Sequence, residues 1–123
     1  MRWIIDGMNV IGSRPDGWWR NRHQAMVTLV ERLEAWRRAG DDVTVVFERP
    51  PKPPIESTVV TVAFAPRAAA NSADDEIVRL VCADGQTADI CVATSDRTLA
   101  ERVRAAGASV VPAERLRGLI EPR

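Results

Sequence analysis

Residues 2–11 read RWIIDGMNVI. They show the pattern that recurs along the chain, in which an apolar run of strand length is followed by a polar residue. The run Trp3-Ile4-Ile5 predicts a strand that ends at Asp6. Ligands of open α/β sheets bind beyond the carboxyl ends of the strands. Asp6 is therefore a candidate functional group, although Asp6-Gly7 is also the sequence of a simple turn.

Strand-length apolar runs continue to alternate with helical periodicity along the chain. Five strands are predicted, at Arg2–Asp6, Val43–Glu48, Thr58–Phe64, Ile90–Thr94 and Ala108–Val111. Apolar residues at helical spacing predict helices through Met26–Trp36, Ala73–Val81, Leu99–Ala106 and Glu114–Leu119. Short strands separated by helices predict an α/β fold, with a mostly parallel five-stranded sheet and helices on both faces.

Composition points to one globular domain over residues 1–123. The chain is 46% hydrophobic and 28% charged, and its length fits a single domain. Its longest apolar runs fall well short of the ~20 residues of a membrane span, and the N-terminus lacks a secretion signal. We therefore expect a cytoplasmic protein without a membrane partner. Seventeen basic residues balance seventeen acidic ones, so any site for a polyanion must be local.

Carboxylates are predicted to gather at one edge of the sheet. Asp6 and Glu48 end two strands, Asp96 follows a third in the sequence Thr94-Ser95-Asp96, and Asp74 opens a helix. A cluster of oxygen ligands suits Mg²⁺ or Mn²⁺. We expect no zinc site, because the single His and the two Cys lack the spacing of its ligands.

Each acid also has a structural interpretation. Asp96 could cap the helix that follows it. Ser72 and Asp75 have the spacing of a capping box, which would account for Asp75. Asp74 lies three residues before Ile77 on the apolar stripe, so its carboxylate is predicted to point toward the sheet and to need a partner. We therefore prefer Asp74 to Asp75 as a ligand.

The segment Arg14–Arg22, RPDGWWRNR, follows the first strand and interleaves arginine with tryptophan. Guanidinium groups can contact phosphate through two hydrogen bonds, and indoles can stack on unpaired bases. The alternative is that one Trp packs under the loop, and we expect one Trp to be buried and the other exposed. The predicted substrate contacts in this segment are Arg14, Trp18, Trp19, Arg20 and Arg22.

Three motifs occur in a fixed order: DGMNVI from Asp6, ADDEI from Ala73 and VATSD from Val92. In this order they resemble the NYN-domain family, most closely the YacP-like branch of the PIN-domain-like ribonucleases. The resemblance runs from Trp3 to about Val111. It implies a PIN-like three-layer sandwich with strand order 3-2-1-4-5, in which Asp6 and Asp96 lie on neighbouring strand ends.

The resemblance also implies a site. The family's acidic cluster corresponds to Asp6, Asp74 and Asp96, which would be both catalytic residues and ligands of Mg²⁺ or Mn²⁺. Asn9 matches the Asn of the first motif and would hold Asp6 or a metal-bound water. Further candidates beside this cluster are the ligands Asp75 and Glu48 and the substrate contacts Ser95 and Arg97.

The implied function is a metal-dependent endoribonuclease that hydrolyses phosphodiester bonds in single-stranded RNA, with ribosome-associated mRNA among the candidate substrates. The alternative is a non-catalytic RNA- or ribosome-binding module with the same fold. The three aspartates argue against that alternative, because a pure binder does not need like charges beside a polyanion. The sequence contains no GxxxxGK[ST] or GxGxxG nucleotide-binding motif, and it leaves the oligomeric state open.

Overall fold

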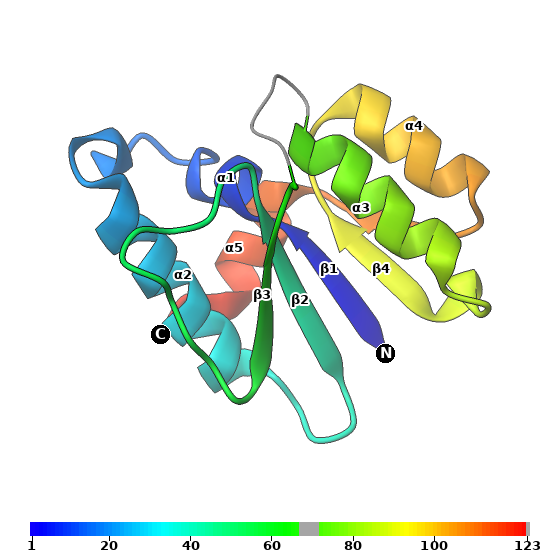
Figure 1. Ribbon diagram of the computed structural model, residues 1–123, viewed down its shortest axis with the longest axis horizontal. Helices are drawn as coiled ribbons and strands as arrows, with labels where there is room; N and C mark the ends of the chain where they lie inside the picture. Colours follow the sequence, from blue (N-terminus) through cyan, green and yellow to red (C-terminus); the bar gives the residue numbers. More distant parts are fainter. Residues whose placement is uncertain (67–71, 123) are drawn as a thin grey trace.

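The computed structural model describes residues 1–66 and 72–122 (Figure 1). Five parallel strands form one sheet in the order β3-β2-β1-β4-β5, as the resemblance implied. The strands are β1 (Arg2–Asp6), β2 (Asp42–Phe47), β3 (Val60–Phe64), β4 (Ile90–Ala93) and β5 (Ser109–Val111). The predicted α/β class and the predicted strand order are therefore both confirmed.

Helices cover both faces of the sheet (Figure 1). One face carries α1 (Gly7–Ile11), α2 (Arg22–Trp36) and α5 (Ala113–Ile120). The other carries α3 (Ser72–Ala83) and α4 (Arg97–Ala105). Two 3-10 turns, η1 (Trp18–Arg20) and η2 (Thr87–Asp89), join these elements. No helix among the residues that the structure describes is long and apolar enough to cross a membrane.

Two apolar cores, one on each face, explain why the strands are apolar at consecutive positions. Ile5 packs in the core with Leu33 of α2, whereas its neighbour Ile4 packs in the core with Ile77 of α3. Successive side chains of a strand point to opposite faces, so a strand covered on both sides needs apolar residues at both. This burial holds the carboxyl end of β1 in a fixed place at the middle of the sheet.

The alternative of a simple turn at Asp6-Gly7 is wrong, because α1 begins directly at Gly7. A Cβ atom on Gly7 would lie 2.6 Å from Cε1 of Phe47 and 3.0 Å from the carbonyl oxygen of Val46. Only glycine therefore lets the chain pass so close to β2. This close approach places Asp6 at the junction of a buried strand and a helix.

Most predicted boundaries agree with the structure to within one residue. The largest difference is at α2, which starts at Arg22 and not at Met26, and β3 starts at Val60 and not at Thr58. The hydroxyl of Ser57 accepts hydrogen bonds from the N–H groups of Val59 and Val60, at 3.2 and 3.0 Å. The same hydroxyl donates to Glu34 of α2. This side-chain turn occupies the backbone donors that a longer strand would have used.

Candidate active site at the carboxyl edge of the sheet

Asp6 lies at the centre of the candidate site and is only 6% exposed. The hydroxyl of Thr94 donates a hydrogen bond of 2.9 Å to its carboxylate. Burial raises the pKa of Asp6 from its ordinary value of 3.8 to about 6. The Thr94 bond opposes that rise, and the negative charges of Asp74, Asp96 and Glu48 add to it. Four acids from four segments thus act on one another at this edge.

Asp74 and Asp75, neighbours in the first turn of α3, have different surroundings. Asp74 is half-buried, and burial followed by the charge of Asp96 raises its pKa, while Arg102 opposes the rise. Asp75 is 71% exposed and forms an ion pair with Arg102 at 3.0 Å. Asp74 is therefore the one of the two whose charge is coupled to Asp6, in line with the preference drawn from the apolar stripe.

The capping box proposed for Ser72 and Asp75 is wrong. Ser72 is already helical, and its hydroxyl has no hydrogen-bond partner within residues 1–66 and 72–122. A capping residue would precede the helix and accept a bond from a backbone N–H group two or three residues on. The partner of Asp75 is instead Arg102 on the neighbouring α4.

Asp96 is the N-cap of α4, as its structural interpretation predicted. Its Oδ1 accepts a hydrogen bond of 2.9 Å from the N–H of Leu99. The N–H of Asp96 in turn donates to the hydroxyl of Thr94 at 3.1 Å, and that hydroxyl holds Asp6. A cap uses one carboxylate oxygen, so capping and cation binding by the other oxygen are compatible.

Asn9 and Ser95 both position backbone in this structure. The side-chain oxygen of Asn9 accepts a hydrogen bond of 2.8 Å from the N–H of Ser95. In the described part of the chain Asp6 is held by Thr94 and not by Asn9, while a contact of Asn9 with a metal-bound water stays a prediction. The hydroxyl of Ser95, expected to contact substrate, accepts a bond of 2.9 Å from the N–H of Ala113 at the start of α5. Together they fix the turn that carries Asp96.

The donor chemistry of the acidic cluster fits a hard divalent cation, because all of its side-chain donors are oxygens. Within the two described ranges, no three His, Cys, Asp or Glu side chains stand close enough together to coordinate one ion. Mg²⁺ usually keeps several water ligands and needs only one or two carboxylates. The arrangement is therefore compatible with an ion held partly through water, and the ligand assignment stays a prediction.

The segment Arg14–Arg22 divides into parts with different roles. Trp18 is half-buried against the core and Trp19 is 49% exposed, so one Trp packs and the other faces solvent, as expected. The guanidinium carbon of Arg22 lies 5.2 Å from the centre of the Trp18 ring. Arg20 is exposed, as is Arg97 at the start of α4.

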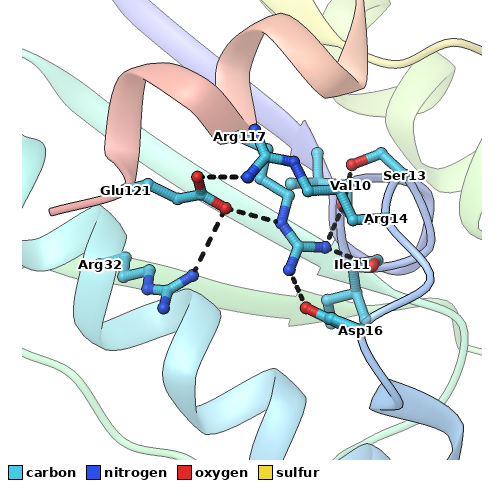
Figure 2. Close-up of polar contacts among 8 residues, drawn as sticks. All are labelled: Val10, Ile11, Ser13, Arg14, Asp16, Arg32, Arg117 and Glu121. Atoms are coloured by element: carbon cyan, nitrogen blue, oxygen red, sulfur yellow. Dashed lines mark hydrogen bonds and ion pairs between the residues drawn. The ribbon is translucent and has the colours of Figure 1, made fainter. Parts of the chain in front are cut away.

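Arg14 does not present an unpaired guanidinium for phosphate, which corrects the expectation for this residue. It forms an ion pair with Glu121, beyond the end of α5 (Figure 2). Glu121 also contacts Arg117 at 3.2 Å and lies 4.0 Å from Arg32. Arg14 therefore takes part in a charge network on the face that carries α5.

Arg117, which the sequence analysis did not single out, holds this network together. Its guanidinium donates to the carbonyl of Ile11 at 2.7 Å and contacts that of Val10 at 3.4 Å, both at the end of α1 (Figure 2). It also pairs with Asp16. A charged residue four positions after Ala113, on the buried stripe of α5, was the signal that could have identified it. Arg117 thus fixes the far end of α1, the helix that begins at Gly7 directly after Asp6.

The five-stranded sheet in the order β3-β2-β1-β4-β5, with acids at its carboxyl edge, has the PIN-like α/β architecture that the resemblance implied. The sequence matches the YacP-like NYN domain over residues 3–122, and the chain belongs to that family. No curated protein matches it.

Solved structures of Rae1 (YacP) from Bacillus subtilis are similar to this chain. A mutant form superimposes with a TM-score of 0.77 at 29% identity, covering 97% of this chain and 74% of that one. A second structure of the same protein gives a TM-score of 0.76 at 28% identity, covering 97% and 73%.

Proposed function

We propose that this protein is a metal-dependent endoribonuclease that cleaves single-stranded RNA at the carboxyl edge of the sheet. The observation that supports this function best is the buried Asp6, whose pKa is raised by burial and by three neighbouring acids. Such a group is stabilised by taking up a proton or by binding a cation. Family membership adds the ribonuclease-type domain in which this cluster sits.

The residues that would hold Mg²⁺ or Mn²⁺, partly through bridging water ligands, are Asp6, Asp74 and Asp96, with Glu48 beside them. A divalent ion bound there would neutralise phosphate charge and lower the pKa of a bound water. Thr94 orients Asp6 through its hydroxyl, and Asn9 fixes the turn before α4. The chain thus supplies a set of oxygen donors held in place by hydrogen bonds. A cation bound to them would neutralise the negative charge of the phosphodiester.

The test is cleavage of a circular, unstructured RNA by purified protein with Mn²⁺, with Mg²⁺ and with EDTA. A circular substrate reports endonucleolytic cleavage alone, because it has no ends. We expect cleavage with either metal, none with EDTA, and none by Asp96→Asn. Asp89→Asn is the matched control, since Asp89 is exposed in η2, immediately before β4 at the opposite edge of the sheet.

Two results would contradict the proposal. Binding of the circular RNA without cleavage in any metal would favour the non-catalytic RNA-binding alternative. Equal cleavage by Asp96→Asn and the wild type would show that the acidic cluster does not carry the reaction.

A further inference from the structure

We infer that one unpaired nucleotide of the substrate lies in a groove beside the acidic cluster, an inference that rests on the proposed function. The groove lies between α1, the start of α2 and the proline-rich segment that follows β2, and its volume is about 360 Å³. That volume is within the range of ligand clefts. We call it the proline-rich groove; its walls include Met8, Arg22, Met26, Glu48, Arg49 and Lys52.

The proline-rich groove begins at the candidate active site. Glu48, which lines it, directly follows β2, and its charge contributes to the raised pKa values of both Asp6 and Asp74. Met8 lies on α1 only two residues after Asp6. A strand whose phosphate reaches Asp6 would therefore have its next nucleotide at the mouth of this groove.

Three cations line the proline-rich groove. Arg22, Arg49 and Lys52 are exposed, and none of them pairs with an acid in the described ranges 1–66 and 72–122. Arg14, by contrast, is committed to Glu121. Glu48 is the single acid that lines the groove. The three cations outnumber it, so the groove is locally positive on a chain with no net charge. Such a surface suits consecutive phosphates.

The side walls of the groove are held in place before any ligand binds. Figure 1 shows the segment after β2 passing over α2 on its way to the start of β3. The ring nitrogen Nε2 of His23 donates a hydrogen bond of 2.7 Å to the carbonyl of Pro53, which joins this segment to α2. Prolines at 50, 51, 53 and 54 fix the backbone further. A preformed groove lowers the ordering cost of binding.

The apolar lining of the groove favours an unpaired base. Met8 and Met26, both half-buried, contribute apolar surface beside the three cations. A base face can pack against such side chains only when it is not stacked in a duplex. Phosphate contacts and an apolar wall together indicate single-stranded RNA as the occupant.

The first experiment measures salt dependence of binding, with a short unstructured RNA and the Asp96→Asn protein at fixed Mg²⁺. Three phosphate contacts on a single strand predict a log–log slope of about −2, and each lost contact reduces it by about 0.7. We expect that reduction in Arg49→Ala and in Lys52→Ala. Arg38→Ala is the control, since Arg38 is exposed beyond the far end of α2, about 22 Å from its start.

The second experiment places a single abasic nucleotide at successive positions of the RNA. Loss of the base next to the cleaved bond should weaken binding about fivefold or more, whereas abasic nucleotides far from it should have little effect. Equal binding by all of these RNAs would overturn the assignment of a base to the groove.

The outcomes separate this inference from the proposed function. Unchanged salt slopes in Arg49→Ala and Lys52→Ala, with normal cleavage by the wild type, would overturn nucleotide binding in the proline-rich groove. The proposed nuclease activity would stand. Reduced slopes without cleavage in any metal would support nucleotide binding in the proline-rich groove and would overturn the proposed nuclease activity.

Discussion

Asp6→Asn should make the metal-free protein more stable at neutral pH. The carboxylate of Asp6 is buried, and its pKa of about 6 stands well above 3.8. That difference, at about 1.4 kcal/mol for each pKa unit, corresponds to roughly 3 kcal/mol that folding loses when Asp6 is ionised. Asparagine carries no charge and can still accept the hydrogen bond from Thr94.

The sign of the effect follows from proton uptake. Between about pH 4 and pH 6 the folded protein holds a proton on Asp6 that the unfolded chain has released, so stability falls as the pH rises. The difference between Asp6→Asn and the wild type should be small below pH 4 and reach its full size above about pH 6. Asp16 and Glu121, whose pKa values are lowered, act in the opposite direction and only at lower pH.

The assay is urea unfolding in EDTA at closely spaced pH values from 3.5 to 7.5, a range that spans about 3.8 to about 6. The same series with Mg²⁺ should narrow the difference between the two proteins, since the wild type gains more stability from the cation. A difference between the proteins that does not change with pH, or a variant that is less stable throughout, would refute the reasoning.

Three further changes should separate catalytic from structural roles. Asp96→Asn should abolish cleavage at unchanged stability, whereas Asp96→Ala should also lose about 1 kcal/mol, because only asparagine can replace the cap on Leu99. Gly7→Ala should cost about 1–3 kcal/mol in urea unfolding, since the added Cβ would lie 2.6 Å from the Phe47 ring. Arg117→Ala should cost roughly 2–4 kcal/mol, because two helix-end carbonyls and two carboxylates would lose their donor.

Matched variants check the expectations for Gly7 and Arg117. Gly118→Ala adds a Cβ that meets nothing within 4 Å, so it should leave stability unchanged or raise it by up to about 1 kcal/mol. Arg115→Ala removes an exposed arginine from the same helix as Arg117 and should have little effect. Equal losses in Gly7→Ala and Gly118→Ala would show that the contact with Phe47 is not limiting. Equal losses in Arg115→Ala and Arg117→Ala would remove the special role of Arg117.

The sequence alone could place the acids at one edge of the sheet, because the direction of the strands determines at which edge each one ends. Every strand of a parallel sheet ends at the same edge, so Asp6 and Glu48 lie at one edge, where the charge of Glu48 acts on Asp6. Helical periodicity also favoured Asp74 over Asp75 as a ligand, since a carboxylate on the apolar stripe of a helix faces the core. The α/β class and the five strands follow from the same local patterns.

Contacts between distant segments could be decided only by the tertiary structure. Arg14 and Glu121 are separated by 107 residues, and no local pattern shows that this arginine is neutralised. Asn9 and Ser95 meet across 86 residues, so the Asn that the motif alone connected with Asp6 fixes a turn. The proline-rich groove likewise needs Arg22 and Lys52 on the two sides of one cleft. Local periodicity determines which face a side chain takes, but packing determines which segment lies opposite, because that depends on distances in the folded chain.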